Sequence, residues 1–248
     1  MNCWAKAMPE RGPRVAESKF KSKGIGEGIE GAAFIVAALI TPFLRCWRAR
    51  WGATDEEVRR TLPGDEMVPH PKWGWTHAVS IRASAAEVWP WLVQIGQGRG
   101  GFYSYESLEN LIGCDIHNAD RVIPEFQHLQ VGDSIRLHPR MPAYPVAIVE
   151  PERALVLNAR ADTQTGKTFE LTDKLPEKYI NSSWMWFLDD NEWPTRLISR
   201  GRGDYRGLAN ALGFGPCLME PINFAMDRKM LLCIKQRAES LARKNLKN

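Results

Sequence analysis

The sequence lacks any cysteine pattern that would hold a metal ion or a disulfide framework. Its five cysteines are scattered along the chain, and no C-x-x-C pair occurs. An odd and unpatterned set of this kind is typical of reduced thiols. We therefore expect a cytoplasmic location, and neither a zinc ribbon nor a disulfide-rich fold.

Catalytic motifs are also missing. The chain contains no G-x-S-x-G elbow, no H-E-x-x-H helix and no P-loop, and its five histidines do not follow ligand spacing. Asp115 and His117 could act together as a base or as metal ligands. We expect instead that Asp115 is a turn residue and that His117 is a surface imidazole. The sequence therefore predicts no metal site, no cofactor and no defined catalytic group.

Charge of one sign is not in large excess. The 248 residues carry a net charge of +4, with 44% hydrophobic and 25% charged residues. These values are ordinary for a globular chain that forms one large domain or two small ones. A balance this weakly basic does not indicate nucleic-acid binding.

No uninterrupted apolar run reaches the roughly 20 residues that a membrane span needs. The most apolar stretch, "GAAFIVAALITPFL" (31–44), contains Pro42, which ends or bends a helix. Three interpretations stay open: a helix packed on the domain, a helix on a membrane surface, and a full span. Arg and Trp residues over 45–51 would suit a headgroup layer, so residues 31–51 are a candidate membrane contact at the inner face of a membrane.

The composition divides the chain into three parts. Residues 1–24 have no hydrophobic periodicity and are predicted to be a disordered leader. Residues 25–50 are predicted to hold the apolar, membrane-associated helix. Residues 51–248 read as one folded domain, whose first helix opens with a capping box at Thr54 and Glu57.

A G-x-G-x-x-G string at Gly96, Gly98 and Gly101 raises the question of dinucleotide binding. A Rossmann loop must follow a strand, whereas Ser84 and Glu87 form a capping box that starts a helix just before these glycines. The order of elements is therefore wrong for a dinucleotide site. The glycines instead predict a tight chain reversal between that helix and a second one beginning near Ser104.

Short β-type runs separated by Pro, Gly, Asp and Asn follow, at 131–139, 144–152, 154–161, 182–190 and 195–202. No helical pattern interrupts the first three, which indicates antiparallel hairpins. One long helix is predicted from 216 to about 243. The fold class is thus α+β, with one strand near 76–84, two short helices, a run of antiparallel strands and a long terminal helix.

Four segments resemble one branch of the START-like superfamily, also called SRPBCC, which includes polyketide cyclases and lipid-transfer domains. They are "RWGATDEEVRRTLPGDE", "VWPWLVQIGQGRGGFYSYESLENLIG", "NADRVIPEFQHLQVGD" and "EPINFAMDRKMLLCIKQRAE", and the resemblance covers about residues 50–243. It implies a helix-grip fold, in which a curved antiparallel sheet wraps around the C-terminal helix. It also implies a cavity for an apolar small molecule between the two.

Candidate ligand-binding residues follow from this expectation. Trp184 and Trp186 alternate onto one strand face, and Met226 and Met230 are one helical turn apart, which suits either an apolar pocket or a filled core. Tyr103, Tyr105 and Glu109 lie at the glycine reversal and on the helix after it, where they either line a mouth or belong to a packed or solvated face. Arg200, in a row with Arg196 and Arg202, either receives an anionic head group or faces solvent.

The expected function is binding of a lipid or another small hydrophobic molecule in an internal cavity near a membrane. The alternative is a cyclase, hydrolase or isomerase that uses polar groups in the same cavity. That alternative requires buried polar side chains with shifted pKa values converging on an apolar pocket.

Overall fold

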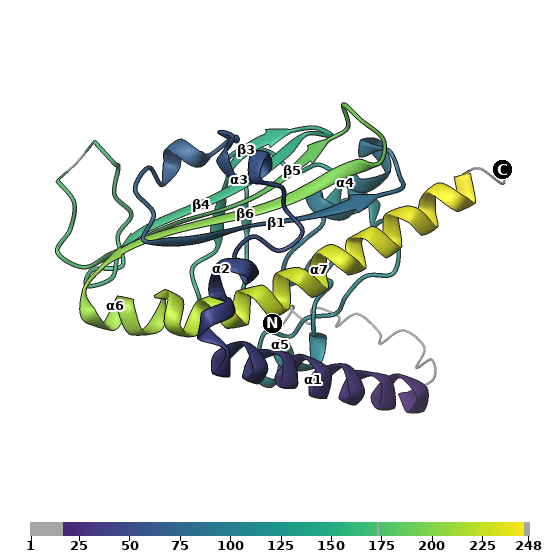
Figure 1. Ribbon diagram of the computed structural model, residues 1–248, viewed down its shortest axis with the longest axis horizontal. Helices are drawn as coiled ribbons and strands as arrows, with labels where there is room; N and C mark the ends of the chain where they lie inside the picture. The colour runs from purple at the N-terminus through teal and green to yellow at the C-terminus, as the bar shows by residue number, and fades with distance from the viewer. Residues whose placement is uncertain (1–16, 173, 246–248) are drawn as a thin grey trace, which may run out of the picture.

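The computed structural model describes residues 17–172 and 174–245, and one antiparallel sheet dominates these residues (Figure 1). Its six strands follow the order β1-β6-β5-β4-β3-β2, and every neighbouring pair is antiparallel. The strands are β1 (Trp73–Ile81), β2 (Ser134–Ile135), β3 (Tyr144–Glu150), β4 (Ala154–Asp162), β5 (Tyr179–Asp189) and β6 (Thr195–Arg206). No helix separates β2, β3 and β4 in the described residues, and both neighbouring pairs are antiparallel, so the predicted hairpins are confirmed.

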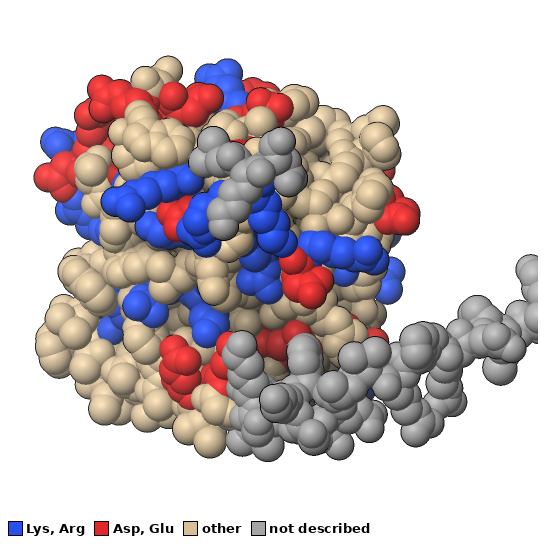
Figure 2. Space-filling view, turned by 90° about the vertical axis from the view of Figure 1, so that its right-hand side faces the viewer, with Lys and Arg blue, Asp and Glu red and all other residues tan. Residues whose placement is uncertain are grey.

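A long C-terminal helix, α7 (Pro216–Asn245), crosses one face of this sheet, which we call the inner face (Figure 1). It packs against β1 and against α4 (Ala85–Val93), the first of two short helices that follow β1. The second is α5 (Glu106–Leu111). Figure 2 looks onto the end where α7 finishes and shows Lys and Arg side chains around it, which complement the negative end of the helix dipole. The helix-grip arrangement that the sequence implies is confirmed.

The inner face carries the main hydrophobic core. Because side chains alternate along a strand, the β4–β5 register that pairs Leu155 with Trp186 and Leu157 with Trp184 puts all four on this face. Met230, Leu231 and Ile234 of α7 belong to the same buried cluster. The predicted sharing of one face by Trp184 and Trp186 is therefore correct.

The outer face of the sheet is covered as well. The segment 53–67, which contains α3 (Asp55–Arg59) and the 3₁₀ turn η2 (Asp65–Met67), packs over it. This layer buries a second apolar cluster: Leu62, Ala78, Ala154, Val156, Met185, Phe187 and Ile198. A sheet buried on both faces explains why so few strand residues are free to contact solvent.

The glycine string forms a chain reversal, as predicted. Gly96, Gly98 and Gly101 all have positive φ angles (133°, 72° and 77°), which glycine adopts at little cost. An isolated antiparallel bridge joins Gly96 to Gly101. The reversal follows α4, whose first turn is capped by the Glu87 carboxylate accepting from the Ser84 backbone N–H (2.9 Å). The glycines directly follow the helix α4 rather than a strand, as the sequence analysis expects.

The N-terminal part differs in its bounds from the prediction. Residues 1–16 of the expected leader lie outside the described residues, and α1 (Glu17–Ile40) starts before the expected residue 25. The helix ends just ahead of Pro42, where the 3₁₀ turn η1 (Pro42–Leu44) leads into α2 (Arg45–Arg48). In the described residues no single helix is long and apolar enough to cross a bilayer. Only Gly26–Ile40 taken with Pro42–Arg48, bent by 92°, has the length and composition.

Three further expectations are corrected. The strand expected over 131–139 is reduced to the two residues of β2, because turns around Gly132 and His138 interrupt it. The helical spacing after Ser104 predicts an apolar side made of Leu108, Leu111 and Ile112. Only Leu108 turns toward α1, and Leu111 and Ile112 are exposed. A short helix, α6 (Leu208–Gly213), and a third 3₁₀ turn, η3 (Pro124–Phe126), were not predicted.

Candidate functional site

Burial divides the inner face of the sheet into two parts. Toward the β5–β6 turn, Leu155, Trp186 and Leu188 are fully covered. Toward the β4–β5 end, Ala159 and Trp184 are only half-buried although the strand register points both inward. The second part is therefore an accessible region of the inner face, and we call it the inner shelf.

The inner shelf is aromatic and carries a polar pair. The Trp184 ring lies 4.5 Å from that of Trp186, centroid to centroid, and its indole N–H donates to the Ser199 hydroxyl (3.1 Å). Beside it, the hydroxyls of Tyr144 and Ser182 are 3.0 Å apart. Burial raises the pKa of Tyr144, so this phenol stays protonated and can donate to a ligand. Neither Tyr144 nor Ser182 was predicted as a site residue, because they meet only through the registers of β3 on β4 and of β4 on β5.

The buried indoles of this interior are incompletely paired. Among the described residues, the Nε1 atoms of Trp73, Trp75, Trp91 and Trp186 have no hydrogen-bond acceptor. Trp73 and Trp75 lie over Gly203 and Gly201 of β6, where a Cβ atom would collide with their rings. Buried donors are normally satisfied, so a group of unpaired indoles is an unusual feature of a core.

The predicted pair on α7 is split by the structure. Met230 is buried in the main core with Trp186. Met226, one turn earlier, is half-buried and belongs to neither apolar cluster. Trp186 and Met230 thus occupy packed core positions, whereas Trp184 and Met226 remain partly accessible.

A buried polar network that sequence reasoning missed links β1, β6 and α7. His77 Nδ1 lies 2.6 Å from Asp227 Oδ2, and its Nε2 donates to the Arg48 carbonyl (2.9 Å). The Ser199 hydroxyl donates to the other Asp227 oxygen (2.8 Å). The carboxylate stands between serine and histidine, so His77 cannot take a proton from Ser199 as it would in a nucleophilic triad. No local motif signals the network, because its members are far apart in sequence.

Tyr103 and Tyr105 lie just before α5 and Glu109 lies within it, but the polar atoms of the three side chains contact different partners. The Tyr103 hydroxyl accepts from Gln94 (2.7 Å), and the Tyr105 hydroxyl donates to Glu30 of α1 (3.4 Å). Burial raises the pKa of Tyr103 and of Tyr105 to about 12. Tyr103 belongs to the main core and has a φ of 58°, which is strained for a side chain of this size.

Glu109 is the buried carboxyl group of this region. Burial raises its pKa to about 7, with a smaller contribution from Glu106, while the hydrogen bond from Ser104 opposes the shift. Oε1 accepts from the Ser104 hydroxyl, and Oε2 is buried with no partner among the described residues. The expected solvated helix face is therefore wrong for Glu109.

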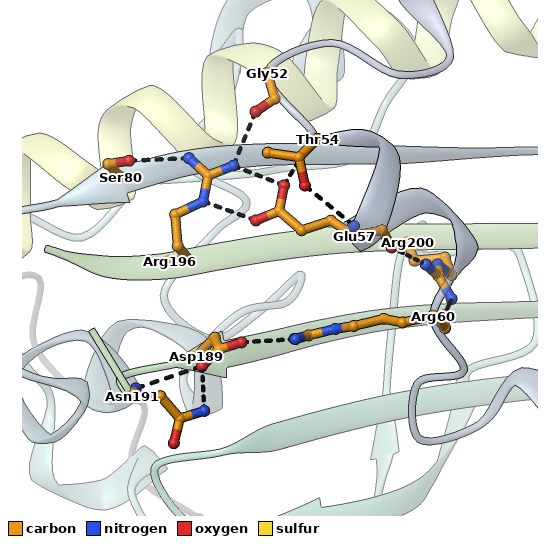
Figure 3. Close-up of polar contacts among 9 residues, drawn as sticks. All are labelled: Gly52, Thr54, Glu57, Arg60, Ser80, Asp189, Asn191, Arg196 and Arg200. Atoms are coloured by element: carbon orange, nitrogen blue, oxygen red, sulfur yellow. Dashed lines mark hydrogen bonds and ion pairs between the residues drawn. The ribbon is translucent and has the colours of Figure 1, made fainter. Parts of the chain in front are cut away.

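Arg200 lies on the outer face, away from α7, and this position corrects its assignment to the inner cavity (Figure 3). Its guanidinium is buried against Asp65 (2.6 Å) and the Glu57 carbonyl (2.5 Å). In the same layer Arg196 forms a bidentate pair with Glu57, and Arg60 pairs with Asp189 (Figure 3). These arginines fasten the 53–67 segment to the sheet, so the row is neither a free anion site nor a solvent face.

Two clefts of the described chain lie on this outer face. One, of about 590 Å³, is bordered by Arg59, Arg60, Thr76 and Arg202, and the other, of about 530 Å³, by Arg60, Arg153 and Phe187. Both are lined in part by charged side chains. Their position does not fit the expected apolar cavity between sheet and helix.

The described residues hold no group of three or more His, Cys, Asp or Glu side chains arranged to bind a metal ion. Asp115 has a φ of 52°, and its carboxylate lies 3.6 Å from the exposed imidazole of His117. The two residues thus have the geometry of a turn residue and a surface imidazole.

The strand order, the paired short helices after β1 and the terminal helix together define a helix-grip protein of the α+β class. No family model matches the chain, and no curated protein matches it. Among solved structures it is similar to protein MLL2253 from Mesorhizobium loti, with 14% identity, 68% of this chain and 98% of that chain covered and a TM-score of 0.36.

Two further solved structures are distant matches of the polyketide-cyclase type. Zhui aromatase/cyclase from Streptomyces sp. R1128 has 12% identity, with 67% of this chain and 93% of that one covered and a TM-score of 0.31. The polyketide-cyclase-like protein Cgl2372 from Corynebacterium glutamicum has 15% identity, with 68% and 89% covered and a TM-score of 0.27. At such values these proteins do not assign a ligand or an activity to this chain.

Proposed function

We propose that the protein binds a small apolar molecule, such as a lipid, on the inner shelf beside α7. The observation that carries this proposal is the inward-facing but half-buried Trp184, set among an aromatic surface and a hydroxyl pair. A large aromatic that points inward and is incompletely covered leaves apolar area for a guest to bury.

The chemistry of the shelf indicates what kind of molecule fits. Trp184 and the small Ala159 offer a flat apolar contact. Tyr144 and Ser182 can donate to or accept from one polar end. A ligand with an apolar body and a single oxygen-bearing head group is therefore favoured.

The enzymatic alternative has weaker support. It needs shifted polar groups that converge on one apolar pocket. Tyr103, Tyr105 and Glu109 have raised pKa values, but they engage Gln94, Glu30 and Ser104 separately. This divergence favours binding over catalysis.

The test is to identify what the full chain carries and to measure how it binds oleic acid. Native mass spectrometry of the purified protein should reveal an apolar adduct that organic extraction removes. After extraction, oleic acid should quench tryptophan fluorescence with a saturable dependence. Ala159→Phe, which fills the shelf, should weaken binding by roughly tenfold or more, about 1.4 kcal/mol.

The matched comparison uses two tyrosines of the same sheet. Tyr144→Phe removes the hydroxyl on the shelf and should weaken binding of the fatty acid. Tyr179→Phe removes the hydroxyl that donates to Asp204 on the outer face (2.7 Å) and should leave binding unchanged. Absence of any adduct together with non-saturable quenching, or full binding by Ala159→Phe, would overturn the proposal.

A further inference from the structure

A continuous apolar surface runs along the outside of α1 and around the corner into α2. Its members are 41–78% exposed: Ile29, Val36, Ile40, Phe43, Leu44 and Trp47. We call it the outer ridge. Ile29, Val36 and Ile40 follow the three-and-four spacing of one helix face. Phe43, Leu44 and Trp47 are exposed after the 92° bend, where the edge of the Trp47 ring also meets Phe224 (5.8 Å between centroids). Exposed apolar surface of this extent marks a contact site.

The ridge is rigidly held by the opposite side of the same helices. Gly28 and Gly31 let α1 approach Ser107 and Tyr105 closely, so α1 is packed against the segment around α5. Phe34 stacks on Phe224 of α7 (5.6 Å between centroids), and Glu27 and Glu30 pair with Lys229 (3.7 and 3.9 Å). Glu27 and Glu30 thus pair with α7, and the described residues on the outer side of α1 are apolar.

In the sequence, basic residues both precede and follow the ridge. Residues 1–25 contain six Lys or Arg and two Asp or Glu, so they carry as much formal charge as the whole chain, +4. At the other end Arg45 is exposed between Leu44 and Trp47. Apolar side chains between basic ones are complementary to a bilayer surface with anionic head groups.

We propose that the outer ridge docks the protein on an anionic membrane surface, with α1 lying parallel to the bilayer plane. Phe43, Leu44 and Trp47 enter the boundary between head groups and acyl chains. The exposed Arg45 between them contacts lipid phosphates. This surface is separate from the inner shelf, so the docking does not depend on the proposed ligand.

Other arrangements fit the observations less well. A span would require α1 to leave Phe224 and Lys229, and the 92° bend would have to straighten. A symmetric contact with a second copy would bring Arg45 and the basic N-terminal residues of both copies together, which like-charge repulsion disfavours. Lipid phosphates satisfy the same charges.

The experiment is co-flotation of the full chain with vesicles of phosphatidylcholine alone or mixed with phosphatidylglycerol. We expect strong binding only to the mixed vesicles, weakened but not abolished by high salt, because the apolar contact is not screened. The variant Ile40→Glu/Phe43→Glu should lower vesicle binding by roughly tenfold or more. Its secondary structure and melting temperature should stay near those of the parent, because both side chains are exposed.

The matched control places the same two charges elsewhere, as Val131→Glu/Met141→Glu. Both positions are exposed apolar residues of the loops that flank β2, so this variant should bind vesicles like the parent. Equal binding by the ridge variant and the parent would overturn the proposal. The proposal would also be overturned if sedimentation equilibrium showed a dimer for the parent and the control variant but a monomer for the ridge variant. A second copy would then occupy the ridge.

Discussion

At the scale of single residues, Glu109 couples burial to proton binding. Its pKa is raised from 4.5 to about 7, mainly by burial, so the folded chain holds a proton that the unfolded chain releases over that range. Where the unfolded state binds fewer protons, stability falls as pH rises. This one group therefore makes the protein less stable at pH 8 than at pH 5, by about 3 kcal/mol.

Glu109→Gln should remove that dependence. The amide can still accept from Ser104 and does not ionise, so the free energy of unfolding should change less between pH 5 and pH 8 than in the parent. Urea unfolding at the two pH values measures the difference. Glu177→Gln, at an exposed loop position, is the control and should keep the parental slope. A parental slope in Glu109→Gln would show that another group causes it.

Residue positions on strands were predictable, and residue environments were not. The period of two placed Trp184 and Trp186 on one face correctly, because alternation follows from backbone geometry alone. The same rule put Arg200 on one face with Arg196, but it could not show that the face is covered. The covering residue Asp65 lies more than a hundred positions earlier in the chain, and no local pattern encodes that contact.

At the scale of elements, a buried ion pair connects α2 to α7. The Arg48 guanidinium donates twice to the Glu220 carboxylate (2.8 and 2.9 Å) and once to the Thr41 carbonyl (2.8 Å). Both side chains are almost fully buried. Removing one partner of such a pair leaves an uncompensated charge, which is far more costly than losing both.

The variants Arg48→Met and Glu220→Met should each lower the free energy of unfolding by about 3–5 kcal/mol, and the double variant should recover most of the loss. A double-mutant cycle by urea unfolding measures the coupling. The exposed pair of Arg59 and Asp55 (4.0 Å) gives the comparison, since Arg59→Met should cost less than about 1 kcal/mol. Equal costs at the two pairs would show that Arg48 is not buried in solution.

Element types and order were predictable because their signals are local. The capping boxes at Thr54 and Ser84 and the stop at Pro42 identified helix ends from a few neighbouring residues. Strand β2 and helix α6 were misjudged because each is six residues or shorter, so too few side chains define a period. Predicting the candidate site needs both local patterns and the pairing of distant strands. Tyr144 and Ser182 could be assigned to it only once the strand register was known.

At the scale of the whole molecule, the N-terminal segment is part of the domain rather than an appendage to it. The backbone N–H groups of Thr76 and Ala78, on the edge strand β1, donate to the carbonyls of Ala49 and Trp51 (2.8 and 3.1 Å). These bonds cover an edge that would otherwise be open to pairing with another chain. The Arg48 carbonyl also accepts from His77 in the interior.

Two truncated chains test whether residues 17–50 contribute to the stability of the folded domain. A chain starting at Trp51 loses the partner of Glu220, the acceptor of His77 and the Ala49 carbonyl on the β1 edge. Its melting temperature should fall by about 10 °C, and it should aggregate through the uncovered strand. A chain starting at Glu17 keeps every contact described above and should melt within about 2 °C of the parent.

In the chain that starts at Trp51, two physical effects act on solubility in opposite directions. Removing residues 1–50 also removes the outer ridge, and loss of exposed apolar surface by itself should make the protein more soluble. Thermal unfolding with size-exclusion chromatography therefore distinguishes the two cases. Lower stability with aggregation means that the buried polar contacts of Arg48 and the β1 edge dominate. An equally stable, more soluble chain would mean that residues 51–248 fold independently and that the N-terminal helices serve only as a docking device.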